Sequence, residues 1–184
     1  MKRTKTETVL VLGANGKSGS HAARAFDEAG WVVRRFDRHN DDLNDVAQGA
    51  ELIFNGLNPP NYEGWATAIP EITRRVLAAA ESSGATVMVP GNVYVFGPHP
   101  GTWNEKTPHR PQTRKGAIRA EMEATYRQAA ERGIQTIILR AGDFVDDVES
   151  GTWLDLMVLK GLAAGRFAYP GRTDAKHSRA YLPD

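Results

Sequence analysis

Val9-Leu10-Val11-Leu12-Gly13-Ala14-Asn15-Gly16-Lys17-Ser18-Gly19, the stretch VLVLGANGKSG, decides the fold of this chain. An apolar run directly before a glycine is typical of a strand that is buried on both faces of a parallel sheet. Apolar residues recur at helical spacing after the glycines, up to Gly30, which is typical of a helix end. The stretch therefore predicts a strand, a tight turn and a helix, in that order.

The glycines of this stretch also predict a ligand. They permit a tight turn and a close approach of the backbone to a bound group. The N-terminus of the following helix presents free N–H groups and a positive dipole, which suit a pyrophosphate. The alternative is a close-packed turn without a ligand. If a nucleotide binds, the residues expected to hold its phosphates are Gly13, Asn15, Gly16, Lys17, Ser18 and Gly19.

Strands and helices alternate along the rest of the chain. Further strands are predicted at 31–36, 51–56, 85–91 and 135–142, and helices at 66–83 and 114–131. Such alternation predicts right-handed crossovers and a parallel sheet covered by helices on both faces. We therefore predict one α/β domain over residues 1–184, with three layers and a doubly wound sheet. Long irregular stretches follow the third and fourth strands, at the edge where such sheets bind ligands.

The composition excludes several classes of protein. The 184 residues are 41% hydrophobic with a net charge of +1, which is ordinary for a globular protein and argues against a broadly basic nucleic-acid binder. The absence of cysteine excludes disulfides, thiolate metal sites and a cysteine nucleophile. No apolar window approaches a membrane span, and the five histidines lack ligand-like spacing. We expect a cytoplasmic protein without a metal, a membrane segment or a nucleic-acid partner.

The end of the second predicted strand bears on the choice of cofactor. Asp37 would accept hydrogen bonds from the adenosine ribose hydroxyls and favours NAD. Arg38 and Lys17 would instead bind the 2′-phosphate of NADP through their positive charge. The alternative is a solvated turn of mixed charge. The choice between NAD and NADP therefore stays open.

Two short segments are further candidate cofactor contacts. Asp42 and Leu43 would place a carboxylate and a backbone N–H at an adenine edge, or Asp42 or Asn44 simply caps a short helix. Asn55, Gly56 and Leu57 follow the third predicted strand, where Gly56 lets the backbone approach a cofactor.

With these motifs in order, the sequence resembles the short-chain dehydrogenase/reductase superfamily, in particular its extended branch of nucleotide-sugar epimerases and dehydratases. The resemblance implies a Rossmann-type sheet that binds NAD(P), with the C-terminal substrate lobe largely absent, in either a shortened or a minimal form of the family architecture. It covers nearly the whole chain and rests on GANGKSG (13–19), DL (42–43), NGL (55–57), VYVFGP (93–98), EKTPHRP (105–111) and LRAGDF (139–144).

The resemblance implies a catalytic serine after the fourth strand and a Tyr-x-x-x-Lys on the next helix. Matching the flanking motifs puts Asn92, Lys115 and Arg119 at the serine, tyrosine and lysine positions, so all three identities are changed. Lys115 would serve as an acid/base, or both cations would contact a phosphate, a substrate anion or solvent. Tyr94 would replace the missing phenol or pack with its hydroxyl exposed. Asp143 is expected to contact substrate or a loop.

Two functions follow from these expectations. The leading one is an atypical NAD(P)-dependent oxidoreductase or epimerase that acts on a hydroxyl or carbonyl of a small or nucleotide-linked sugar substrate. The alternative is an NAD(P)-binding or sensing protein without chemistry, and a purely structural role ranks last. The resemblance also implies a homodimer through the helices near 66–83 and 114–131, and the alternative is that these helices simply face solvent.

Overall fold

The structure is a computed structural model, and it describes residues 6–59, 64–98, 101–169, 171–174 and 177–184. The chain divides into two compact units, Met1–Leu139 and Arg140–Asp184. The expectation of a single domain over residues 1–184 stays a prediction. The first unit holds the glycine turn and nearly all of the predicted strands and helices.

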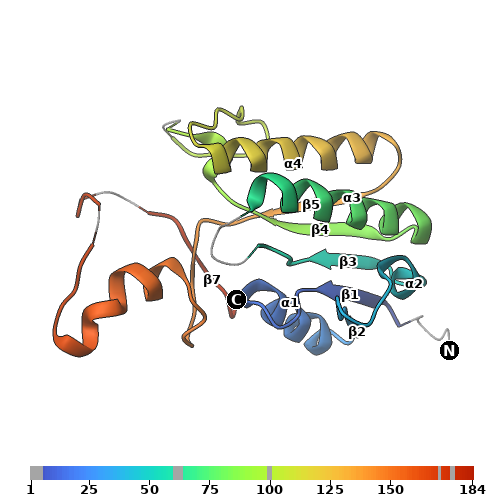
Figure 1. Cartoon of the computed structure of the whole chain (residues 1–184), viewed down its shortest axis with the longest axis horizontal. Helices are drawn as coiled ribbons and strands as arrows, with labels where there is room; N and C mark the ends of the chain where they lie inside the picture. Colours follow the sequence, from blue (N-terminus) through green and yellow to red (C-terminus); the bar gives the residue numbers. More distant parts are fainter. Residues whose placement is uncertain (1–5, 60–63, 99–100, 170, 175–176) are drawn as a thin grey trace. The chain divides into compact units, whose positions relative to one another are not determined.

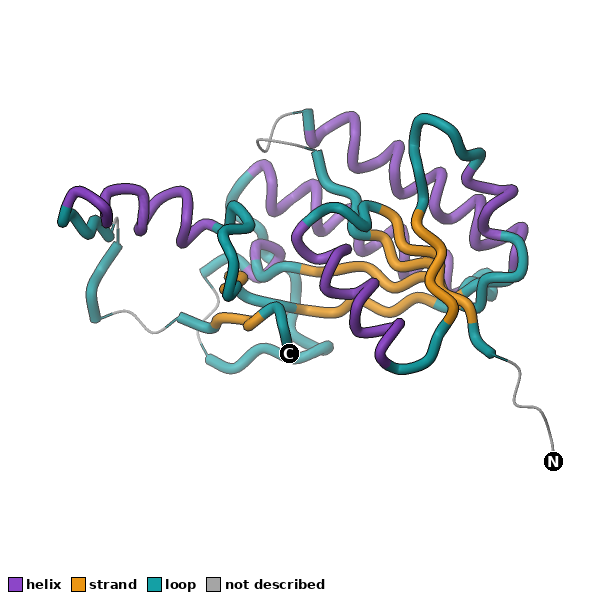
Figure 2. The backbone as a smooth tube through the Cα atoms, turned by 90° about the horizontal axis from the view of Figure 1, so that it is seen from below, coloured by secondary structure: helices purple, strands orange, loops and turns teal. Residues whose placement is uncertain are grey.

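A five-stranded sheet forms the centre of the first unit (Figures 1 and 2). Its order is β2-β1-β3-β4-β5, and β1 pairs in parallel with both β2 and β3, as β3 does with β4. In this order the chain winds outward from β1 in both directions, so β1 and β3 flank the switch point where such sheets bind ligands. The strands are β1 (Thr8–Leu12), β2 (Val32–Arg35), β3 (Leu52–Asn55), β4 (Thr86–Gly91) and β5 (Thr136–Arg140).

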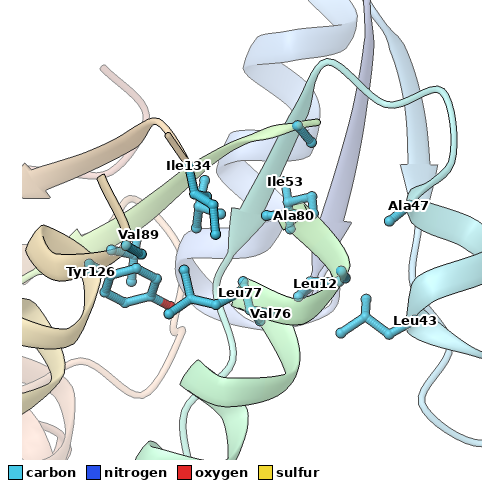
Figure 3. Packing of buried hydrophobic residues seen from close by; sticks show 14 of the residues in the cluster. Leu12, Leu43, Ala47, Ile53, Val76, Leu77, Ala80, Val89, Tyr126 and Ile134 are labelled. Carbon is cyan, nitrogen blue, oxygen red and sulfur yellow. The ribbon is translucent and has the colours of Figure 1, made fainter. Parts of the chain in front are cut away.

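Helices cover both faces of this sheet, as Figure 1 shows. On one face, Leu10, Leu12 and Ile53 pack in a cluster with residues of α3 and α4 (Figure 3). On the other face, Val9 and Val11 pack with residues of α1. Alternate residues of β1 thus enter opposite cores, which explains its unbroken apolar run. The helices are α1 (Lys17–Glu28), α2 (Leu43–Ala47), α3 (Trp65–Ser83) and α4 (Arg114–Glu131).

The predicted α/β fold of three layers is therefore confirmed. Gly30 has a φ of 84°, a conformation that favours glycine, directly after the end of α1. Thr113 caps α4, because its hydroxyl accepts a hydrogen bond from the Gly116 N–H at 3.0 Å.

The second unit contains short elements that the sequence did not predict. Strands β6 (Asp143–Val145) and β7 (Arg179–Tyr181) pair in parallel. Between them lie a π-helical segment, η3 (Leu154–Val158), and a 3₁₀ segment, η4 (Leu159–Ala164). Among the helices of the described residues, none combines the length and hydropathy needed to cross a membrane.

Candidate functional site

The glycine turn between β1 and α1 is packed so closely that side chains are excluded from it. Gly13 has a φ of 73°, and its carbonyl accepts a hydrogen bond from the Gly16 N–H at 2.8 Å. A Cβ atom on Gly19 would lie 2.1 Å from the Gly13 oxygen, and one on Gly56 would lie 2.9 Å from the Leu12 oxygen. The end of β3 therefore closes against the turn, as Gly56 permits.

The start of α1 is not capped by a side chain. Gly16 is the N-cap residue, so it has no side-chain oxygen to offer to the N–H groups of the first turn, and that turn contains no acidic residue. Ser, Thr, Asp or Asn usually fills this position. The open cradle and the uncapped N–H groups fit a bound phosphate. Lys17 and Ser18 begin the helix here, and Asn15 lies exposed in the turn.

Asp37 and Arg38 lie in an exposed turn after β2. The Asp37 carboxylate accepts hydrogen bonds from the His39 N–H at 2.9 Å and the Asn40 amide at 2.6 Å. The hydrogen bonds from His39 and Asn40 lower the pKa of Asp37 below its ordinary value. Arg38 Nε lies 3.1 Å from His39 Nε2. Asp37 and Arg38 thus form an exposed turn of mixed charge, which was the alternative to a cofactor contact. The contacts of Asp37 with a ribose and of Arg38 with a 2′-phosphate stay predictions.

Asp42 caps α2, as the simpler of the two interpretations proposed. Its Oδ1 accepts hydrogen bonds from the N–H groups of Asn44 at 2.8 Å and Asp45 at 3.2 Å. The Leu43 side chain is buried in the core. The contact of this pair with an adenine stays a prediction.

Asn55 turns inward at the end of β3 rather than toward solvent. Its amide nitrogen donates to the Tyr126 hydroxyl at 3.1 Å, and its oxygen accepts from the Leu57 N–H at 3.2 Å. The Gly56 N–H donates to the Leu12 carbonyl at 3.0 Å. Asn55 thus serves to shape the backbone of residues 55–57, which lies against the glycine turn.

Lys115 and Arg119 of α4 share one aromatic ring. Lys115 Nζ lies 5.6 Å from the centre of the Trp65 ring, and the Arg119 guanidinium carbon lies 4.7 Å from it. Arg119 is buried, and its Nη2 donates to Asn58 Oδ1 at 2.8 Å. Cation–π contacts of desolvated groups stabilise such an arrangement. Through Asn58, which follows β3, Arg119 is connected to the strand end that borders the glycine turn.

Asn92 and Tyr94 lie beside the start of α4. The Asn92 oxygen accepts a hydrogen bond from the Tyr94 N–H at 3.0 Å. Tyr94 opens the 3₁₀ turn η2 (Tyr94–Phe96), and its side chain is 41% exposed. A Cβ atom on Gly116 would lie 2.7 Å from the Tyr94 carbonyl, so the two segments are in contact. The catalytic assignments of Asn92 and Tyr94 stay predictions. Asp143 lies in β6, in register with Arg179 of β7.

Sequence reasoning missed several residues of this region. Trp65, Asn58 and Tyr126 were not singled out, although Tyr126 lies seven residues after Arg119 and so on the same helix face. Glu123, one turn after Arg119, is almost fully buried, and its Oε2 lies 3.3 Å from Nε2 of His109. The sequence did carry a signal for Glu123, because Lys115, Arg119 and Glu123 follow one another at i, i+4 spacing on one face of the helix. Among the described residues, no group of His, Asp and Glu is arranged to hold a metal ion.

The strand order and the glycine turn define a Rossmann-type α/β fold. No protein-family model and no curated protein matches the sequence. Solved structures do share the fold. A dTDP-4-dehydrorhamnose reductase from Bacillus anthracis, in complex with NADP, has a TM-score of 0.71 at 18% identity, over 90% of this chain and 62% of that one. A UDP-glucuronic acid 4-epimerase from Bacillus cereus, in complex with UDP-glucuronic acid and NAD, has a TM-score of 0.75 at 16% identity, over 95% and 69%.

A nucleoside-diphosphate-sugar epimerase from Pseudomonas aeruginosa has a TM-score of 0.65 at 17% identity, over 77% of this chain and 54% of that one. The chain thus spans less than two thirds of the reductase and of the Pseudomonas epimerase. By their names, these structures are one reductase and two epimerases. The predicted resemblance is therefore confirmed at the level of the fold.

Proposed function

We propose that this chain binds NAD or NADP at the C-terminal edge of the sheet, with the pyrophosphate at the start of α1. The observation that carries the proposal is the glycine cradle, in which Gly16 leaves the first helical turn uncapped beside the switch point. The similar reductase holds NADP and the similar epimerase holds NAD, which supports the same site here. The residues proposed to contact the cofactor are Gly13, Asn15, Gly16, Lys17, Ser18, Gly19, Asp37, Arg38, Asp42, Leu43, Asn55, Gly56 and Leu57.

The proposed activity is that of an atypical oxidoreductase or epimerase, which acts on a hydroxyl or carbonyl of a small or nucleotide-linked sugar substrate. When bound, the cofactor supplies hydride transfer. The Lys115 ammonium would donate a hydrogen bond to the reacting oxygen, and the Asn92 amide would orient the same group. Arg119 stays charged and would support the site through Asn58 and Trp65.

A second candidate function is NAD(P) binding or sensing without chemistry. It is favoured by the way in which Arg119 is engaged, because the guanidinium is buried between Trp65 and Asn58. The serine, tyrosine and lysine of the family pattern are also all replaced in this chain. Under this proposal the cofactor site is kept and Lys115 holds no reacting group.

Calorimetric titration of the chain with NAD and NADP tests the binding proposal, and Gly16→Asp is the matched variant because it places a carboxylate where the phosphate would lie. Binding by the wild-type chain that is lost in Gly16→Asp supports the site. Absence of binding of either cofactor would refute it. Cofactor oxidation or reduction over a panel of alcohols, ketones and sugar nucleotides then decides between the two functions. Turnover that Lys115→Ala abolishes supports the enzyme, and binding without turnover supports the sensor.

We also propose that α3 and α4 pair with the same helices of a second copy. A groove of about 480 Å³ runs between them, with Ile69, Leu77 and Ile118 among the residues that line it. Arg74 and Glu121 also line the groove. Charges of both signs around an apolar floor suit an interface in which one surface meets its own copy.

A further inference from the structure

A chain of two hydrogen bonds crosses the core of the first unit from α4 to the end of β3. The Leu57 N–H donates to Asn55 Oδ1 at 3.2 Å, and Asn55 Nδ2 donates to the Tyr126 hydroxyl at 3.1 Å.

This chain has one direction and is shielded from water. The Asn55 amide accepts one bond through its oxygen and donates the other through its nitrogen, an arrangement in which hydrogen bonds strengthen one another. The exposed fractions are 4% for Asn55 and 0% for Tyr126, so water cannot replace a lost partner. Burial raises the pKa of the Tyr126 hydroxyl, which therefore keeps its proton at neutral pH.

The free end of this chain lies at the proposed cofactor site. Gly56, between Asn55 and Leu57, is the residue that closes against the glycine turn, and a Cβ atom on it would lie 3.4 Å from the Gly19 Cα. The Gly56 N–H donates to the Leu12 carbonyl, which fixes one side of this short segment. The Asn55 side chain fixes the other side, and it is itself held by Tyr126.

We propose that Tyr126 is a positioning residue for the cofactor site, because it holds Asn55 in the rotamer that shapes the backbone of residues 55–57 against the glycine turn. This inference rests on the proposed binding of NAD or NADP. It assigns a role in that site to a side chain on α4 that lies wholly inside the core. A hydroxyl is needed for this role, and the phenyl ring alone does not supply it.

The variant that tests the proposal is Tyr126→Phe, which keeps the ring and removes the hydroxyl. We expect the Kd for the cofactor to rise about tenfold, since a segment that must be ordered on binding weakens affinity. The matched control is Val76→Ala, which removes buried methyl groups from the same core cluster and leaves the hydrogen bonds in place. The control is expected to lose stability and to keep its Kd within about twofold.

A second measurement separates positioning from general loosening of the core. In Asn55→Leu, the Leu57 N–H and the Tyr126 hydroxyl both lose the Asn55 side chain as a hydrogen-bond partner. The Tyr126 hydroxyl then has no further effect on the segment, so the double variant Asn55→Leu/Tyr126→Phe should bind the cofactor no more weakly than Asn55→Leu alone. Additive losses of affinity would overturn the proposal. So would equal shifts in Kd for Tyr126→Phe and Val76→Ala, or wild-type affinity in Tyr126→Phe.

Amide hydrogen exchange tests the positioning without any cofactor. The Leu57 N–H should exchange at least tenfold faster in Tyr126→Phe than in Val76→Ala, after correction for global stability. Should the wild-type chain bind neither NAD nor NADP, the proposed function fails, while this exchange measurement still decides whether Tyr126 holds the segment. Unchanged protection of Leu57 in Tyr126→Phe would refute the inference by itself.

Discussion

Gly19→Ala should destabilise this chain, although alanine is the better helix former. The new Cβ atom would lie 2.1 Å from the Gly13 carbonyl oxygen and 2.7 Å from its carbon. Because both of these close contacts are with backbone atoms, the turn and the helix must move apart by about 1 Å. Such overpacking costs about 3 kcal/mol, at the upper end of the usual range, and the helix propensity of alanine offsets about 1 kcal/mol. We therefore expect a net loss of about 2 kcal/mol in the free energy of unfolding.

Urea denaturation followed by circular dichroism measures this loss, and Gly16→Ala is the matched control. Gly16 has a φ of −87°, which any residue adopts, and a Cβ atom there would have one close contact, at 3.2 Å from the Gly13 oxygen. Gly16→Ala should therefore cost about 1 kcal/mol or less. A Gly19→Ala chain as stable as the Gly16→Ala chain would refute the close packing of the turn.

Three further predictions concern other parts of the first unit. Thr113→Ala removes the cap of α4 and should cost about 1 kcal/mol in thermal or urea unfolding, whereas Thr113→Ser should cost much less. The pKa of Asp37 is lowered from 3.8 by its turn, so its contribution to stability is present above pH 3.8 and is lost as the pH falls through the folded-state pKa. NMR titration should place that pKa below 3.8, and Asp37→Asn should flatten the acid limb of the stability profile. Ile118→Glu, in the groove between α3 and α4, should convert the proposed dimer to a monomer in analytical ultracentrifugation, whereas the exposed Glu131→Gln should leave the mass unchanged.

The central layers of the fold were predictable because local pattern and tertiary environment agree. The run Val9–Leu12 has no polar residue, and the structure buries each of its side chains on one or other face of the sheet. The spacing of the glycines was equally informative, since Gly13 and Gly19 touch each other across a single turn. Such features depend on residues that are close in sequence.

The surroundings of the candidate site were less predictable, because they depend on partners far apart in the chain. The sequence placed Lys115 and Arg119 one helical turn apart, but it did not show that Trp65 packs against both. Asn55 was a candidate cofactor contact, and the sequence did not show that its side chain donates to the Tyr126 hydroxyl, 71 residues away. Helical spacing tells which residues share a face and is silent on what that face meets.

The second unit shows where periodicity gives no guidance. The residues that the structure describes between 143 and 184 form only short elements, and several of their apolar residues are more than half exposed, such as Leu156, Leu162 and Phe167. Short elements with so many exposed apolar residues give no regular alternation to detect. The β6–β7 pair depends on residues more than thirty positions apart, which a local pattern cannot reveal.

The direction of β1 has a practical consequence for work with this protein. The glycine turn follows the C-terminal end of β1, and the N-terminal end of the strand lies one strand length away, roughly 16 Å, at the opposite edge of the sheet. A purification tag or a surface linker joined ahead of β1 therefore begins on the side remote from the cradle. Immobilisation through that end leaves the proposed nucleotide entrance facing the solution, which suits sensor-chip measurements of cofactor affinity.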